Sequence, residues 1–451
     1  MSHHHDIALK DEDIIIPAGH KLHGVPNKAL IVGGVFLLAT FGLGATDLGH
    51  FYFSYLTAFM FWLAIALGAL GFVVIHHAVR AGWSVVVRRL AEHLMTGLPI
   101  LALLFLPILA GLFVPGGHGD HETWLFHWTH APDDPVIAAK SGYLNTTFFI
   151  IRAAIIFGLW FVLVRFYRAK SIGQDAAGEA ELTRDVQWWA PLGTLAFAVT
   201  LTVAAIDWMM SLDPHWYSTI FGVYYFAGCI ISVNAVLVLL SIWLQKHGLL
   251  RNVINTEHFH DLGKYVWSFT IFWAYIGFSQ YMLIWYANIP EETMWFGYRM
   301  NGTWLYVSLF LGVGHFVVPF FGMMSRHIKR NPKTLMFGAV WMLCMHWVDM
   351  YWLIQPVMTN HHGVQDAPFH IMDITAFVGI GAILFGVVIR NLLAVPLVPV
   401  KDPRLQESLA FEELTDGDEE YLAVAARAAD HDGDGALDLL IAGHDSEAIV
   451  V

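Results

Sequence analysis

The feature that most constrains this chain is a series of apolar runs, each about 20 residues long, which is the length needed to span a bilayer as a helix. The runs lie at approximately 28–47, 52–79, 94–114, 144–168, 188–211, 217–244, 263–288, 302–324, 334–358 and 370–390. Charged residues make up only 14% of the chain, whereas soluble proteins contain about 25%. The sequence therefore predicts an all-α membrane protein with about ten transmembrane helices.

Lysine and arginine are distributed unevenly between the two sets of loops that these helices define. One set is rich in lysine and arginine, whereas the opposite set contains only Lys140 and Arg299. The two ends of the chain add Lys10, Lys21, Lys28, Arg390, Lys401, Arg404 and Arg427 to the first set. The basic loops contain Arg80, Arg88, Arg89, Arg165, Arg168, Lys170, Arg184, Lys246, Arg251, Lys264, Arg326, Lys329, Arg330 and Lys333. Because basic loops stay on the cytoplasmic side, we expect both termini to be cytoplasmic, in agreement with an even number of helices.

Three segments follow from this topology: a cytoplasmic N-terminal segment at 1–27, a membrane domain at 28–390 and an acidic cytoplasmic tail at 391–451. Part of the tail, 430–441, resembles a calcium-binding EF-hand loop, but Ile441 stands where the loop needs a bidentate glutamate. We therefore favour a solvated acidic tail over a calcium site. The expected surroundings are a lipid bilayer, and no nucleic acid is expected among the partners.

Two helix ends share a pattern that indicates an internal repeat. Residues 207–214 align with 349–356, so that Asp207 and Pro214 have the same spacing as Asp349 and Pro356. Both stretches end helices that run from the cytoplasmic to the outer side, the fifth and the ninth. The simplest interpretation is two related four-helix bundles, helices 2–5 and helices 6–9, with the first and tenth helices outside them.

Several ionisable or polar side chains fall inside the predicted helices, where they are energetically costly and often functional. The candidates for a proton path are Asp47, His76, His77, Arg152, Asp207, Gln280, His315, His346, Asp349 and Asp373. Three Asp/His pairs recur at one-turn spacing, which places each pair on one face of a helix: Asp47/His50, His346/Asp349 and His370/Asp373. Arg152 is long enough to neutralise a buried acid. The alternative is that these groups only hold helices together through hydrogen bonds.

The sequence gives little support for a bound cofactor. Its two cysteines, Cys229 and Cys344, lie far apart, and it contains no CxxC or CxxCH motif of the kind that binds iron–sulfur clusters or c-type haem. His315 and His346 could be axial ligands of a b-type haem, an alternative that we disfavour. The outer loop contains His118, His121, His127 and His130, whose spacing matches no strong metal-ligand pattern.

Four stretches of the chain resemble a known family. They are DWMMSLDPHWYST at 207–219, GVYYF at 222–226, DLGK at 261–264 and FSQYMLIWYANIPEE at 278–292. In these stretches the chain is similar to the F subunits (ActF) of bacterial alternative complex III, a quinol:electron-acceptor oxidoreductase. The resemblance covers about 28–390 and leaves the acidic tail outside.

This resemblance implies an NrfD-like fold of two four-helix bundles, in the bacterial cell membrane. It implies as partners a paralogous membrane subunit that binds quinol, an iron–sulfur subunit, c-type cytochrome subunits, small membrane subunits and, in some bacteria, a terminal cytochrome oxidase. Haem c and iron–sulfur clusters would reside in those partners and no cofactor in this chain, whose implied role is proton translocation rather than redox chemistry.

We carry that role over only to the membrane-embedded residues identified above, with Asp207 as the leading member. Two alternatives remain open. One is direct binding of quinol by Asp207, His215 and Tyr217, which would need an apolar slot with a few hydrogen-bonding groups. The other is a purely structural scaffold of the complex.

Overall fold

The computed structural model describes residues 9–114, 125–129, 133–361 and 366–411, and these form α-helices with no strand. Nine helical spans in this part of the chain are long and apolar enough to cross a membrane. They are α2 (Val25–Gly44), α3 (Leu48–Ala78), α4–α6 (Val85–Met95, Leu98–Leu104 and Leu106–Ala110), α8 (Thr146–Ala177), α9 (Ala180–Trp208), α10 (Phe221–Lys246), α13–η4–α14 (Trp304–Leu311, Gly312–Val317 and Val318–Gly322), α16 (Pro332–His361) and α17 (Ile371–Leu392). The predicted all-α, multi-pass membrane fold is confirmed.

The predicted seventh helix, 263–288, corresponds to α11 (Thr256–Ala287), which is less apolar than the nine. It begins seven residues earlier than its apolar run, in a polar stretch where the side chain of Asn255 accepts hydrogen bonds from the backbone N–H groups of Glu257 and His258. A capped helix start of this kind satisfies N–H groups that the helix itself leaves unpaired, so the helix extends beyond the hydrophobic signal.

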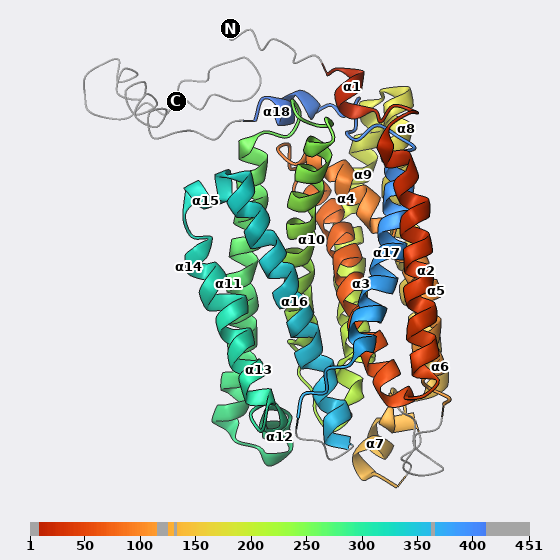
Figure 1. Cartoon of the computed structure of the whole chain (residues 1–451), viewed down its shortest axis with the longest axis vertical. Helices are drawn as coiled ribbons and strands as arrows, with labels where there is room; N and C mark the ends of the chain where they lie inside the picture. The colour runs from red at the N-terminus through yellow and green to blue at the C-terminus, as the bar shows by residue number, and fades with distance from the viewer. Residues whose placement is uncertain (1–8, 115–124, 130–132, 362–365, 412–451) are drawn as a thin grey trace, which may run out of the picture. The chain divides into compact units, whose positions relative to one another are not determined.

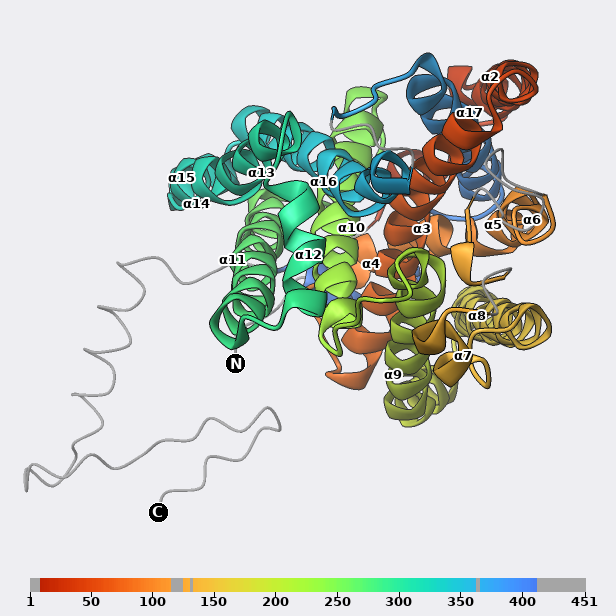
Figure 2. The ribbon, with the colours of Figure 1, turned by 90° about the horizontal axis from the view of Figure 1, so that it is seen from below.

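The helices are arranged around α3 and α10, which are almost completely buried (Figures 1 and 2). Their backbones approach closely at Gly68, where an added Cβ would lie 2.2 Å from the carbonyl oxygen of Cys229. Around α3 pack α4–α6, α8 and α9, around α10 pack α11 and α16, and α13–η4–α14 packs against α11 and α16. These two groups are the four-helix units that the repeat predicted. The peripheral helices α2 and α17 pack against each other beside α3.

Prolines or a π-helical segment alter the backbone hydrogen bonding of three helical spans. The span α4–α6 is divided before Pro99 and Pro107, each of which lacks a backbone N–H group. Helix α16 continues through Pro356. The span α13–η4–α14 contains a π-helical segment, Gly312–Val317, and such segments are frequent at functional sites.

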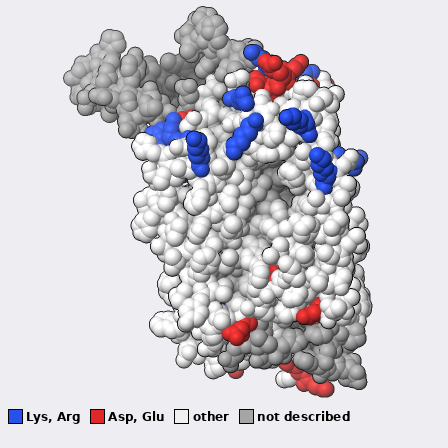
Figure 3. Space-filling model, viewed as in Figure 1, with Lys and Arg blue, Asp and Glu red and all other residues white. Residues whose placement is uncertain are grey.

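One end of the bundle, which we call the basic end, carries α1 (Asp11–Ile14), α15 (Arg326–Arg330) and α18 (Leu405–Leu409). Figure 3 shows lysine and arginine side chains gathered towards this end, while the middle of the visible face is largely uncharged. The far end carries α7 (Pro135–Lys140) and α12 (Pro290–Arg299).

Two details of the predicted boundaries differ from the structure. The compact unit extends past the predicted limit at 390 to Leu409, because Leu405, Ser408 and Leu409 are buried and α18 packs on α4. Arg88 and Arg89, which we expected in a basic loop, lie buried in α4, where acidic side chains pair with them. The EF-hand-like stretch and His118, His121 and His130 lie outside the described residues.

Candidate functional site

Asp207 lies at the C-terminal end of α9 and is fully buried. Arg152 of α8 donates to both of its carboxylate oxygens, from Nε to Oδ2 at 2.6 Å and from Nη2 to Oδ1 at 3.1 Å. Tyr143 donates its hydroxyl to Oδ1 at 2.8 Å. Both oxygens of Asp207 are therefore bonded to the protein, and a two-point contact with a guanidinium is the strongest pairing that a carboxylate makes.

The Arg152 guanidinium makes a further hydrogen bond and two contacts with aromatic rings. Its Nη1 donates to the carbonyl oxygen of Tyr143 at 2.8 Å, and its guanidinium carbon lies 3.9 Å from the Tyr143 ring centre and 4.4 Å from that of Phe148. Cation–π contacts of this kind stabilise a buried guanidinium. The pair of Asp207 and Arg152 thus forms a fixed connection between α9 and α8, with its charges already compensated.

Asp349, the second copy of the repeat, has a different environment. It is 1% exposed, in the middle of α16, and its donors are neutral. Tyr224 of α10 donates its hydroxyl to Oδ1 at 2.5 Å, and Trp273 of α11 donates its indole N–H to Oδ2 at 3.1 Å. Among the described residues, no lysine or arginine forms an ion pair with Asp349.

Two histidines lie in the interior around Asp349. His346 precedes it by one turn of α16, and His315 belongs to the π-helical segment, stacked on Trp273 with ring centres 3.9 Å apart. Both imidazoles are fully buried, and none of their four ring nitrogens has a hydrogen-bond partner in the described protein. Because buried polar atoms are nearly always satisfied by protein or ordered water, these nitrogens favour a hydrated centre.

The space for His346 depends on a small residue of the neighbouring helix. A Cβ added to Gly228 of α10 would lie 2.8 Å from Cε1 and 3.1 Å from Nδ1 of the His346 ring. The ring centre of Phe61 from α3 lies 5.3 Å from that of His346. His346 therefore sits at the junction of α3, α10 and α16, where the two bundles meet.

Beyond Asp349, Arg299 of α12 supports the helix where Pro356 interrupts its hydrogen bonds. Proline has no N–H to donate, so the carbonyl of Trp352, four residues earlier, loses its usual partner. Arg299 donates Nε to that carbonyl at 3.1 Å and Nη2 to the carbonyl of Leu353 at 2.9 Å. Its guanidinium carbon also lies 3.4 Å from the ring centre of Trp295.

The three predicted Asp/His pairs differ in their contacts. In Asp47/His50 the ring Nδ1 lies 2.8 Å from Oδ2, and Asp47 also caps α3. In His370/Asp373 the contact involves the backbone N–H of His370, which donates to Asp373 Oδ2 at 2.8 Å and forms part of a capping box. No described hydrogen bond joins His346 to Asp349. Asp47/His50 and His370/Asp373 thus mark the starts of α3 and α17, at the far end of the bundle.

The remaining proton-path candidates are spread over both ends of the bundle. His76 and His77 are buried near the basic end of α3, where His76 Nδ1 lies 2.7 Å from the carbonyl oxygen of Phe72 and the other ring nitrogen is unpaired. Gln280 of α11 accepts a hydrogen bond from the Ser218 hydroxyl at 2.8 Å. No described hydrogen bond connects His76 or His77 with Asp349.

The residues named for the alternative of direct quinol binding do not converge. His215 is at the surface, where its Nε2 lies 2.6 Å from Oδ2 of Asp134, and Tyr217 is 57% exposed beneath Lys140. Asp207 is buried and fully bonded. An apolar groove of about 540 Å³ instead lies next to Asp349. Its polar lining groups belong to Tyr224, Trp273, Tyr275, Gln280, Tyr281, Ser308 and Trp352.

Sequence reasoning missed a buried cluster of charges at the basic end. Glu92 contacts Arg89 at 3.1 Å and accepts a hydrogen bond from Ser171, while Arg89 also donates to Asp175 at 2.8 Å. Arg88 pairs with Asp402. The signal was present in the sequence, because Arg88, Arg89 and Glu92 recur at one-turn spacing immediately before an apolar run.

Within the described residues, no group of three or more His, Cys, Asp or Glu side chains is arranged to hold a metal ion, and both cysteines are free thiols. Comparisons with protein-family models and with curated proteins find no match to this chain. The class that the fold and site define is a multi-pass α-helical membrane protein with buried carboxylates and imidazoles at the junction of two four-helix units.

Proposed function

We propose that this chain is a cofactor-free membrane subunit of a quinol:electron-acceptor oxidoreductase of the alternative complex III class, in the bacterial cell membrane with its basic end in the cytoplasm. Its role would be to provide a proton path, with Asp349 as the central proton-exchanging group. Haem c and iron–sulfur clusters would reside in partner subunits. The resemblance of 207–219 and 278–292 to ActF subunits supports the assignment to this class.

The observation that carries the proton path is the environment of Asp349. A buried carboxylate without a cationic partner is costly, and taking up a proton is the ordinary way in which such a group loses its charge. Tyr224 and Trp273 hold the carboxyl in place without neutralising it. His346 and His315 supply unpaired ring nitrogens around it, as proton relays in membrane transporters do.

Asp207 is less suited to that task although it is the first copy of the same pattern. Its charge is offset by Arg152, so a proton arriving there would have to break a two-point ion pair. We therefore assign Asp207 and Arg152 a supporting role. Protons would then move through Asp349 and the groups around it rather than through Asp207.

The test is the proton-to-electron stoichiometry of the intact complex reconstituted in proteoliposomes. Asp349→Asn preserves both hydrogen bonds, because the amide oxygen accepts from Trp273 and the amide N–H₂ donates to the Tyr224 hydroxyl. We expect this variant to assemble and oxidise quinol while moving fewer protons per electron. Thr270→Val is the control, with unchanged stoichiometry, at a buried threonine of α11 whose hydroxyl donates to the carbonyl of Val266. Normal pumping by Asp349→Asn would refute the proton path.

The assignment to the complex has its own test. Affinity purification of this chain from native membranes should bring down subunits with the absorption of c-type haem and with iron–sulfur clusters. A chain that purifies alone and transports a solute in proteoliposomes would instead be an independent secondary transporter.

A second function, direct quinol binding, is favoured by the groove beside Asp349. The groove places Tyr224, Trp273 and Gln280 within an otherwise apolar lining, the combination that a hydrophobic ligand with a polar head group requires. An azido-quinone photolabel distinguishes the possibilities: cross-links to α11 and α13 would support this site, and cross-links near His215 or Tyr217 would support the surface stretch instead.

A further inference from the structure

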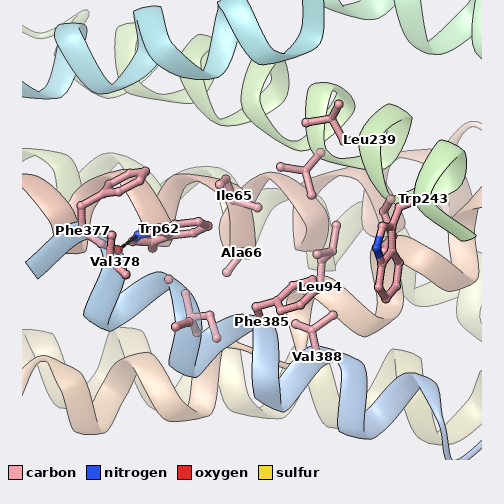
Figure 4. Close-up of a pocket in the computed structure, with 15 residues that line it drawn as sticks. Trp62, Ile65, Ala66, Leu94, Leu239, Trp243, Phe377, Val378, Phe385 and Val388 are labelled. Atoms are coloured by element: carbon pink, nitrogen blue, oxygen red, sulfur yellow. Dashed lines mark hydrogen bonds between the residues drawn. The ribbon is translucent and has the colours of Figure 1, made fainter. Parts of the chain in front are cut away.

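A second groove runs along the outside of the bundle between α10 and α17, with α3 as its floor (Figure 4). Its volume is about 570 Å³, and its lining is formed by apolar and aromatic side chains that include Trp62, Ile65, Leu239, Trp243, Phe385 and Val388. It shares no lining residue with the groove beside Asp349. The proposed proton path therefore does not explain the groove between α10 and α17.

The two ends of the groove differ in polarity. At the end nearer the membrane centre, the indole N–H of Trp62 donates to the carbonyl oxygen of Phe377 at 2.8 Å, the dashed line in Figure 4. Gly381 allows α17 to pass close to this ring, since an added Cβ would lie 2.1 Å from Cζ2 of Trp62. At the other end, the indole nitrogen of Trp243 has no hydrogen bond to the other lining residues in Figure 4.

Basic residues follow where the apolar lining stops. On α10 the lining positions 236, 239, 240 and 243 form one helical stripe, which continues at one-turn spacing to Lys246 and His247. The Lys246 ammonium is exposed, and its one described contact is the sulfur of Met336 at 3.9 Å. The dry groove thus opens at the basic end beside an ammonium group that no described carboxylate neutralises.

This polarity identifies the occupant. A partner helix about 10 Å across could lie along the groove, but an apolar helix would gain nothing from the exposed Lys246 ammonium at its mouth. A quinone head group would find no donor along the apolar walls, whereas lipid acyl chains need none. A negatively charged head group would meet the indole N–H and the ammonium at the mouth, and basic pockets between transmembrane helices bind anionic lipids in this way.

We propose that the groove between α10 and α17 is a binding site for an anionic phospholipid, with an acyl chain against Trp62, Leu239 and Phe385 and the phosphate at Trp243 and Lys246. The lipid would fasten the peripheral α17 to the core helix α10. The site does not depend on the proposed role of Asp349.

Native mass spectrometry of the full-length protein in detergent tests the proposal, with phosphatidylglycerol as the probe and phosphatidylcholine as its zwitterionic counterpart. We expect phosphatidylglycerol to bind at least about fivefold more tightly, and Lys246→Glu to weaken it by about fivefold or more, since one basic side chain near a membrane surface contributes about that factor. Ala382→Trp, which fills the groove, should reduce the binding of both lipids.

The control is Arg184→Glu, which makes the same change in charge on an exposed residue of α9, away from the groove. It should leave the affinity for phosphatidylglycerol unchanged. Equal binding of the two lipids, an equal loss in Arg184→Glu and Lys246→Glu, or displacement of phosphatidylglycerol by a long-chain quinone would each overturn the proposal. If Ala382→Trp fails to fold, the comparison of the two charge reversals decides the question.

Discussion

The two copies of the repeat each place a buried aspartate seven residues before a proline but surround it differently. Asp207 receives two hydrogen bonds from Arg152 and one from Tyr143, whereas Asp349 receives one each from Tyr224 and Trp273. The helix of Asp207 ends one residue later. The helix of Asp349 continues through a proline to His361.

This difference shows that the role of a buried acid is decided by its neighbours rather than by its own sequence pattern. In the first copy a cation from the adjacent helix compensates the charge and makes the acid a structural connection. In the second copy the cation, Arg299, instead binds the backbone carbonyls around Pro356 and leaves the carboxyl to neutral donors. The two copies therefore share a buried acid and its spacing to a proline but differ in the groups that surround the acid.

The largest expected effect that tests this comparison is the loss of stability when each acid is neutralised. Asp207→Asn leaves the Arg152 charge buried without a partner, which costs about 3–5 kcal/mol of unfolding free energy. Asp349→Asn retains its hydrogen bonds and should cost about 1 kcal/mol or less. Unfolding measured by tryptophan fluorescence in bicelles compares the two variants directly.

A double variant serves as the control for that pair. Because replacing both members of a buried ion pair by apolar residues is often neutral, Arg152→Leu combined with Asp207→Leu should recover most of the stability lost in Asp207→Asn. Equal destabilisation by Asp207→Asn and Asp349→Asn would contradict the distinction between the two copies.

A smaller effect is expected where the second copy crosses Pro356. Arg299→Met removes hydrogen bonds to the carbonyls of Trp352 and Leu353 and should cost about 2–3 kcal/mol. In a Pro356→Ala background the restored N–H can bond to the Trp352 carbonyl, so the same substitution should cost about 1 kcal/mol less.

A double-mutant cycle in bicelles measures this coupling. The matched cycle uses Arg299→Met with Ala339→Gly, a buried position of α16 that lies outside the proline turn, and should show no coupling. Coupling of the same size in both cycles would mean that Arg299 stabilises α16 as a whole rather than the interruption at Pro356.

Much of the fold could be predicted because hydrophobic length reports directly on membrane helices. Every predicted run contains a helix, and the repeat at 207–214 and 349–356 predicted the two four-helix units. The helix ends could not be predicted equally well, because α8, α9 and α11 extend beyond the membrane-length runs into polar segments. There, capping and side-chain pairing decide the boundary, and neither contributes to hydropathy.

The candidate site was only partly accessible from the sequence. The acids could be identified because they lie inside apolar runs. Arg152 could be named as a possible partner because its side chain is long. Both observations need only the sequence of single helices. The sequence could not show that Tyr224 and Trp273 come from two other helices to Asp349, or that His315 stacks on the same tryptophan. Such contacts depend on how helices pack, so the sequence alone could not distinguish the surroundings of Asp349 from those of Asp207.

The smallest expected effect concerns Asp134, which contacts His215 in the surface turn after the first copy of the repeat. Burial opposes the charge of Asp134, but hydrogen bonds from His215 and from the backbone N–H groups of Ile137 and Val136 outweigh it and lower the pKa of Asp134. A carboxylate with a lowered pKa stabilises the folded form above its usual pKa of about 4, and the contribution is lost as the pH falls through the lowered value. Hydrogen exchange of α7, corrected for intrinsic rates, should therefore accelerate below about pH 4, and Asp134→Asn should remove this step. The last turns of α16, held by Arg299, should show no such step, and acceleration in both regions would mean that acid loosens the far end as a whole.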